Sequence, residues 1–367
     1  MRAVVASLAA LAALTAGIAV PRTGPAAAAA KAPAVRGGVA RRTDAAGAVL
    51  ASSPGTRGAR VTCTAPAAYR AFAARLSAGL DGALRGRAGH QAVTVHDQVT
   101  GVSCQADAGR RFDSASIVKA VILAALLRWH QETRTPLSPG EKGEATLMIT
   151  RSDNDAASDL WNWVGLRRLQ RFLALAAMKE TGLGPGPYWG LTQATAHDEM
   201  LLLGLLARPN AVLSGGSRAY SLGLMARVIP GQRWGTPAGA PAGVTVHVKN
   251  GWLPDGTGWH VNSIGVFTGR GVNYAIAELT DDNPSERYGI DTIQDVARVV
   301  HRELRAARGA AGARLTANLA PSVAATAAPS PGPAAPARPG PPSPWAVVAA
   351  LPSPWAVVPA LPARPAP

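Results

Sequence analysis

Lysine and acidic residues are scarce in this 367-residue chain. Five lysines stand beside 32 arginines, and the 22 acidic residues leave a formal charge of +15. Arginine cannot release its proton at working pH, whereas a buried lysine can. Two of the five lysines, Lys119 and Lys249, lie in short polar motifs. We therefore expect these two lysines to have chemical roles.

Several sequence patterns are absent, and each absence excludes a class of protein. The chain has no Gly-x-Ser-x-Gly, no His-Glu-x-x-His, no phosphate-binding glycine loop and no Cys-x-x-Cys. His247 and His260 fit strand positions better than metal ligation, so no metal site is expected. The positive charge is spread along the chain rather than concentrated with interleaved aromatic residues, which argues against nucleic-acid binding. Two explanations of the positive charge remain open. The protein is attracted in a general way to anionic polymers of the cell envelope, or its coding sequence simply favours arginine.

The N-terminal segment resembles a secretory signal. After two residues an apolar run extends from Ala3 to Val20, and small residues at Ala26–Ala30 suit cleavage. We expect a signal peptide over residues 1–30, a flexible linker over 31–60, and a secreted or cell-envelope protein. The alternative interpretation is an uncleaved membrane anchor.

The C-terminal segment, residues 311–367, is rich in alanine and proline. A ten-residue unit at Pro342–Leu351 recurs at Pro352–Leu361, and its prolines disfavour both helix and central strand. A disordered tail is expected, either inert or serving as a wall spacer or a recruitment segment. Residues 61–310 remain for one catalytic domain with a substantial core, expected to be a monomer with no stable membrane span after signal cleavage.

The two cysteines, Cys63 and Cys104, are expected to pair if the chain is exported. Closing a loop of this length stabilises a fold by ~4 kcal/mol in the chain-entropy model. The alternative is a pair of buried free thiols.

Hydrophobic periodicity predicts an α+β fold. Helical patterns span Tyr69–Leu84, everything from Ser116 to about Met225, and a last helix from Ile290 to Leu304. The five predicted strands are Ala92–Asp97, Val102–Ala106, Val244–Lys249, Val261–Phe267 and Asn273–Leu279. We expect a five-stranded antiparallel sheet flanked by the first and last helices, with an all-helical lobe inserted between strands 2 and 3.

The first chemical motif is Ser116-x-x-Lys119. Asp113-Ser114-Ala115 is predicted to cap a buried helix that begins at Ser116, whose backbone amides would then stabilise negative charge. Burial lowers the pKa of a lysine, so Lys119 becomes available as a base. The alternative reading is a plain capping hydroxyl and a snorkelling lysine.

The second motif, Ser152-Asp153-Asn154, lies between two predicted helices. An exposed loop there presents Ser152 for proton relay and Asn154 for hydrogen bonding to a substrate amide. The alternative is a capping turn, since all three residue types favour helix starts.

The third motif, Lys249-Asn250-Gly251, ends a predicted strand. Glycine permits close approach to the backbone, and the next amide, that of Trp252, is a candidate oxyanion donor. A strand running into a turn is the alternative.

The order Ser-x-x-Lys, Ser-Asp-Asn, Lys-x-Gly resembles the serine β-lactamase and penicillin-binding protein superfamily, particularly the class A β-lactamases. The resemblance covers about residues 61–310. It implies that Ser116 is the acylated nucleophile, that Lys119 activates it, and that Ser152 relays a proton. It also implies a β-lactamase/transpeptidase-like fold without a cofactor.

On the substrate side, the resemblance implies that Asn154 holds a side-chain amide and that Lys249 with Asn250 meets a carboxylate. Asn250 stands where the family usually has threonine or serine, and the first two motifs lie closer together than in class A enzymes. The family's Glu-x-x-Leu-Asn segment is missing: Glu180 precedes a Gly/Pro run instead. Arg233 is a weak candidate for helping to hold the carboxylate.

These patterns predict an exported serine hydrolase that opens β-lactam amides through an acyl-enzyme on Ser116. Two alternatives stay open. One is a penicillin-binding DD-peptidase-like enzyme that acts on peptidoglycan peptides and releases β-lactams slowly. The other is a non-catalytic sensor of β-lactams or wall peptides.

Overall fold

The computed structural model describes residues 60–319. The predicted signal peptide, nearly all of the predicted linker and the tail beyond residue 319 lie outside the described residues. No helix within residues 60–319 has the length and apolar character needed to cross a membrane.

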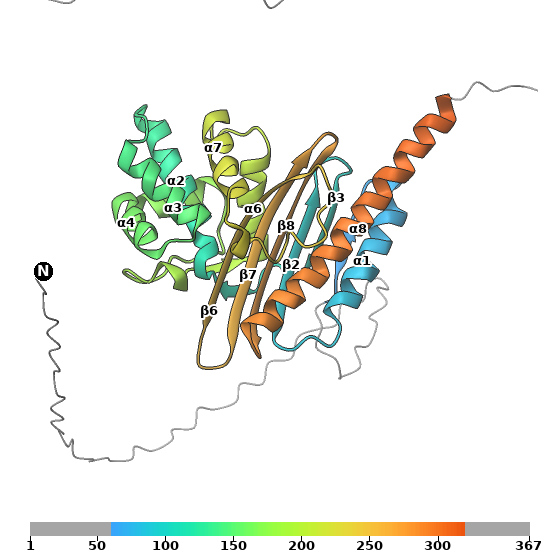
Figure 1. Ribbon diagram of the computed structural model, residues 1–367, viewed down its shortest axis with the longest axis horizontal. Coiled ribbons are helices and arrows are strands. Elements are labelled where there is room, and N and C mark those ends of the chain that lie inside the picture. Colours follow the sequence, from blue (N-terminus) through green and yellow to red (C-terminus); the bar gives the residue numbers. More distant parts are fainter. Residues whose placement is uncertain (1–59, 320–367) are drawn as a thin grey trace, which may run out of the picture. The chain divides into compact units, whose positions relative to one another are not determined.

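An antiparallel sheet of six strands lies at the centre of the described residues (Figure 1). Its strand order is β1-β3-β2-β8-β7-β6. The strands are β1 (Thr62–Thr64), β2 (His90–Asp97), β3 (Val102–Ala106), β6 (Thr245–Pro254), β7 (Trp259–Gly269) and β8 (Val272–Asn283). A second, two-stranded sheet pairs β4 (Arg111–Asp113) with β5 (Gln193–Thr195).

The helices fall into a pair near the two ends of the domain and a group between β4 and β6. The end pair is α1 (Arg70–Leu84) and α8 (Glu286–Leu319). The group is α2 (Val118–Thr133), α3 (Pro139–Thr150), α4 (Asn154–Val164), α5 (Leu166–Leu175), α6 (Ala196–Ala207) and α7 (Gly215–Ala226). Short 3₁₀ turns are η1 (Ala67–Tyr69), η2 (Ala115–Ile117), η3 (Trp189–Leu191) and η4 (Pro230–Gln232).

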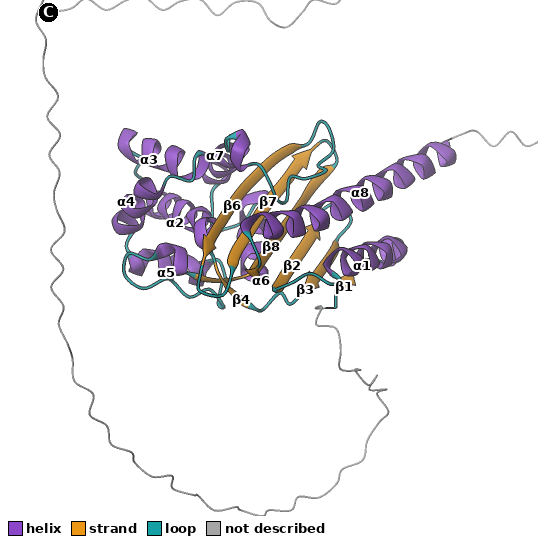
Figure 2. Cartoon of the chain, turned by 60° about the horizontal axis from the view of Figure 1, so that its bottom comes forward, coloured by secondary structure: helices purple, strands orange, loops and turns teal. Residues whose placement is uncertain are grey.

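Two hydrophobic cores cover the two faces of the sheet. Side chains alternate along β8, so that Tyr274 and Ile276 face α1 and α8 while Ala275 and Ala277 face the other helices. Figures 1 and 2 show α1 and α8 lying together against one face. The periodic apolar residues of α1, such as Leu76, are buried there as predicted. The α2 helix is apolar nearly all round because it lies inside the other core, on the sheet face to which Ala275 and Ala277 point.

The α+β fold is confirmed, but two details of the prediction are wrong. The sheet has six strands rather than five, because the three-residue β1 adds to the edge of β3. So short a strand, with Thr62 and Thr64 exposed, carries no readable alternation. The segment between β3 and β6 is also not all-helical, since it contains β4 and β5.

The predicted pairing of Cys63 with Cys104 is confirmed. The two cysteines face each other across β1 and β3, where they are register partners. The disulfide therefore ties the short edge strand to the sheet, at the point where the described chain begins.

We expect replacement of both Cys63 and Cys104 by alanine to lower the free energy of unfolding by ~4 kcal/mol, because the open chain regains loop entropy when it unfolds. Urea unfolding of the variant and the oxidised wild type would measure this. Thiol titration of the wild type provides the control. Equal midpoints in fully oxidised and double-alanine protein would contradict the expectation.

Candidate active site

The predicted nucleophile, Ser116, lies in η2, the 3₁₀ turn between β4 and α2. The prediction that the helix begins at Ser116 is wrong: α2 begins at Val118, and neither η2 nor α2 has a side-chain cap. Ala115, directly before the serine, has a positive φ of 47°. A side chain in this left-handed conformation is strained, and such strain persists only where the surroundings hold it.

Asn262 of β7 is the residue that holds this turn. Its fully buried amide donates to the carbonyl oxygens of Asp113 at 2.8 Å and Ser114 at 3.1 Å. Its own oxygen accepts from the backbone N–H of Thr280 at 3.1 Å. Because the amide fixes the carbonyls that precede η2, the chain enters α2 through a tight turn. Sequence reasoning missed Asn262, although a buried asparagine in an apolar strand was a usable signal.

Gly251 of β6 lies directly against the same turn. A Cβ atom at this position would lie 2.5 Å from the backbone nitrogen of Ser116 and 2.9 Å from the carbonyl oxygen of Ser114. Only glycine permits so close an approach. As β6 is the edge strand of the sheet, it has backbone groups that the sheet leaves unpaired. Trp252, the predicted oxyanion donor, follows next, and its ring packs edge-on against Trp234 at 5.6 Å.

Lys119 of α2 is completely buried and points toward the second motif. Its Nζ donates to the carbonyl oxygen of Ser152 at 2.7 Å, to Asn154 Oδ1 at 2.7 Å and to Ser152 Oγ at 3.3 Å. Burial lowers the pKa of Lys119 to about 7, while the negative charge of Asp153 acts in the opposite direction. A lysine with this pKa is partly neutral at pH 7, so it can accept a proton.

Lys249 of β6 approaches Ser152 from the other side. Its Nζ donates to Ser152 Oγ at 2.9 Å and to the carbonyl oxygen of Asn250 at 2.6 Å. Burial, and then the charge of Lys119, lower the pKa of Lys249 well below its ordinary value. The Ser152 hydroxyl thus bridges two lysines. Ser152 has a positive φ of 57° in the short connection between α3 and α4.

The structure brings the three motifs together, with two differences from expectation. No hydrogen bond joins Ser116 Oγ to Lys119 within residues 60–319. Asn250 is directed elsewhere: both donors of its amide bind loop carbonyls, those of Gln232 at 2.8 Å and Trp234 at 3.0 Å. An amide held in this way has no donor left for the expected contact with a substrate carboxylate.

Two further residues from the sequence analysis are paired with other groups. Glu180 is exposed and pairs with Arg111 at 3.4 Å, so its carboxylate does not face Lys119. Arg233 donates to the carbonyl oxygens of Ala226 at 2.9 Å and Val246 at 3.3 Å.

Trp189 lies in η3, within the loop between α5 and β5, and its ring lies over the Lys119 ammonium. The Lys119 Nζ lies 4.6 Å from the centroid of the Trp189 ring. Sequence reasoning missed this residue because the contact joins segments 70 positions apart.

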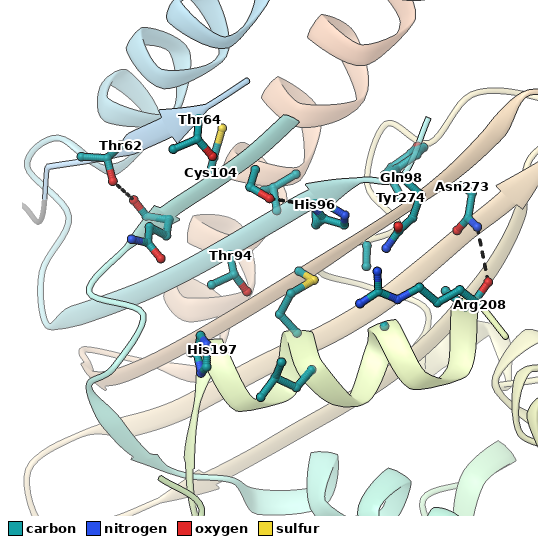
Figure 3. Close-up of a pocket in the computed structure, with 18 residues that line it drawn as sticks. Thr62, Thr64, Thr94, His96, Gln98, Cys104, His197, Arg208, Asn273 and Tyr274 are labelled. Carbon is teal, nitrogen blue, oxygen red and sulfur yellow. Dashed lines mark hydrogen bonds between the residues drawn. The ribbon is translucent and has the colours of Figure 1, made fainter. Parts of the chain in front are cut away.

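Other polar features are separate from this site. Glu199 of α6 is buried with both carboxylate oxygens unpaired, and burial raises its pKa to about 8. A groove of about 340 Å³ lies between α6 and the β1–β3–β2 side of the sheet, with His96 and Arg208 in its lining (Figure 3). None of the residues of the three motifs lines this groove.

Comparison with known proteins agrees with this geometry. A model of the β-lactamase enzyme family matches residues 143–304, which contain the second and third motifs. No curated protein matches the chain in sequence.

Solved structures of serine β-lactamases and penicillin-binding proteins share the fold. The β-lactamase of Sphaerobacter thermophilus DSM 20745 aligns with a TM-score of 0.53 and 21% identity over 62% of this chain and 95% of that one. PBP-A aligns with a TM-score of 0.55 and 21% identity, over 63% and 96%. The TLA-3 extended-spectrum β-lactamase aligns with a TM-score of 0.57 and 17% identity, over 62% and 98%.

The chain is therefore similar in fold to these β-lactamases and to PBP-A. The resemblance predicted from the three motifs is confirmed, and it is class A-like.

We expect Asn262→Leu to lower the free energy of unfolding by at least about 2 kcal/mol, because the buried Thr280 N–H and the Asp113 carbonyl each lose a partner. Urea unfolding measures the change. The control is Asn162→Leu on the exposed face of α4, which should stay within about 0.5 kcal/mol of wild type. Equal effects of the two substitutions would contradict this assignment.

Proposed function

We propose that the protein is an exported serine hydrolase that opens β-lactam amides through an acyl-enzyme on Ser116. The observation that carries the proposal is the Ser152 hydroxyl, hydrogen-bonded to both Lys119 and Lys249. The turn that bears Ser116 packs against the same strand, β6. A nucleophile, a low-pKa base and a relay hydroxyl thus belong to one site.

Acylation proceeds in two steps. Neutral Lys119 takes the proton of the Ser116 hydroxyl while the oxygen bonds to the lactam carbonyl carbon. The negative charge on the carbonyl oxygen is stabilised by backbone N–H groups at η2 and β6. The carbon–nitrogen bond then breaks, and the leaving nitrogen takes a proton from Ser152, which recovers one from the lysines.

Substrate binding draws on the groups that remain free. Asn154 is exposed and its amide nitrogen can meet the substrate's side-chain carbonyl, while its oxygen is held by Lys119. Lys249 would donate to a substrate carboxylate, whose negative charge would favour the protonated form of the lysine. Asn250 contributes through the loop it anchors rather than by direct contact.

Two structural neighbours are described with small molecules bound, and one of these molecules is a β-lactam. A mutant of PBP-A is described as an acyl-enzyme complex with penicillin G, and L2 is described in complex with relebactam. Export rests on the N-terminal apolar run at Ala3–Val20.

One observation favours a second candidate, a penicillin-binding DD-peptidase-like enzyme that acts on peptidoglycan peptides. Glu180 pairs with Arg111 away from Lys119, so it is not in position to activate a deacylating water. In the third candidate, a non-catalytic sensor, the same site binds a β-lactam or a wall peptide without forming a covalent bond.

We expect Ser116→Ala to abolish covalent labelling by benzylpenicillin, because no other oxygen occupies the nucleophile position. Intact-mass spectrometry of the purified protein detects the adduct. Ser285→Ala, an exposed serine before α8, serves as control and should label like wild type. Persistent labelling of the Ser116 variant would defeat the assignment. Failure of the wild type to label or to consume drug would favour the sensor.

We expect the acylation rate to rise with pH through about 7 and to level off above it. Only the neutral form of Lys119 accepts the proton of Ser116, and that form increases as pH passes the lysine's pKa of about 7. Quenched mass spectrometry between pH 5 and 9 measures the profile. Lys119→Arg, whose guanidinium stays protonated, should not acylate at any of these values. A flat wild-type profile would exclude Lys119 as the base.

A further inference from the structure

Within residues 60–319, the Lys119 ammonium is hydrogen-bonded to no carboxylate, and an aromatic ring lies beside it. Its hydrogen bonds go to the carbonyl and hydroxyl of Ser152 and to Asn154 Oδ1. The indole of Trp189 also lies close, with the ring centroid 4.6 Å from Nζ. An indole face attracts a cation but accepts no proton.

The Trp189 ring is held in place. Its Nε1 donates to Ser158 Oγ of α4 at 3.1 Å. The loop before it is anchored to the same helix, since Trp161 Nε1 donates to the carbonyl oxygen of Gly186 at 3.0 Å. The loop after it is tied to the nucleophile turn, because the N–H of Ser114 donates to the carbonyl of Thr192 at 2.8 Å. The indole is therefore a fixed wall of the site.

Three carboxylates were candidates for the base, and none of them is hydrogen-bonded to Lys119. Glu180 pairs with Arg111. Asp153 caps α4 by accepting from the N–H of Ala156 at 2.9 Å. The pKa of Glu199 responds to burial and to Asp198, and Lys119 is not among its influences. Within residues 60–319, no carboxylate is hydrogen-bonded to Ser116, Lys119 or Ser152.

Release of an acyl group by water needs both space and a base. The water oxygen bonds to the acyl carbon, the ester bond to Ser116 Oγ breaks, and one water proton passes to that oxygen. Water is a poor nucleophile, so it must lose this proton as it attacks. Within residues 60–319, no carboxylate is hydrogen-bonded into the site to take the proton, and the Trp189 ring lies on the Lys119 side.

We propose that Trp189 sets the lifetime of the acyl group on Ser116, by covering the Lys119 side of the site and excluding water there. This inference rests on the proposed function, because it requires an acyl-enzyme. A neutral amine needs no base to form its bond to the acyl carbon, and afterwards passes one proton to Ser116 Oγ by way of Ser152. Trp189 therefore favours transfer of the acyl group to an amine over hydrolysis.

The test compares Trp189→Ala and Trp189→Phe with wild type, and with Trp163→Ala as control. Trp163 is an exposed tryptophan of α4 whose side chain contacts Glu141 rather than the site. Intact-mass spectrometry after a pulse of benzylpenicillin gives the acylation rate and the adduct lifetime separately. In parallel, D-alanine is added as an amine, and the ratio of transfer product to hydrolysis product is measured.

We expect Trp189→Ala to shorten the adduct lifetime by about tenfold or more, a change of about 1.4 kcal/mol in activation free energy. Its transfer-to-hydrolysis ratio should fall in parallel, while acylation continues. Trp189→Phe keeps a ring over Lys119 and should retain a long lifetime, as should Trp163→Ala. A purely structural role for Trp189 would lower acylation without making water the preferred acceptor.

Three outcomes would overturn the proposal: an acylated Trp189→Ala with an unchanged or longer lifetime, a Trp189→Phe that releases as fast as Trp189→Ala, or a wild type that hydrolyses its adduct rapidly. If Trp189→Ala does not fold, Ser158→Ala removes the hydrogen bond that holds the ring and should shorten the lifetime by a smaller factor. An unchanged lifetime in that variant would then count against the proposal. A wild type that is never acylated would instead refute the proposed function itself.

Discussion

The burial of two lysines around one serine hydroxyl is the constraint on which the rest of the site depends. An isolated buried ammonium is costly, so each lysine must be hydrogen-bonded and must hold its proton less tightly. The Ser152 hydroxyl and carbonyl, Asn154 and the carbonyl of Asn250 provide those hydrogen bonds. The same burial that requires these hydrogen bonds lowers the pKa of Lys119 to about 7, so that the lysine can accept a proton near neutral pH.

This arrangement requires two parts of the fold to meet closely. Lys119 comes from a helix inside one hydrophobic core, whereas Lys249 comes from the edge strand of the sheet. Gly251 lets that strand approach the turn of Ser116, and Asn262 in the adjacent strand fixes the carbonyls that enter the turn. The strained backbone at Ala115 thus results from packing on both sides rather than from local sequence preference.

The loop between α5 and β5 determines which side chain lies next to Lys119. Its tryptophan lies over Lys119, and its glutamate lies at the surface with an arginine. The two residues are nine positions apart, yet only the aromatic one reaches the site. This loop is anchored to α4 and to Ser114 just before η2. In our proposal, the side chain that the loop presents over Lys119 decides between hydrolysis and retention of the acyl group.

The sequence by itself determined the α+β class, the position of the main strands and end helices, the disulfide and the three motifs. These features depend on local periodicity, on residue type and on short spacings, which a linear reading captures. Tertiary structure decided the remainder. The three-residue β1 exists only because β3 and Cys104 receive it, and Ser116 lies in a 3₁₀ turn because Asn262 holds the preceding carbonyls. The orientation of Asn250 and the placement of Trp189 over Lys119 likewise arise from contacts between distant segments, which no local pattern encodes.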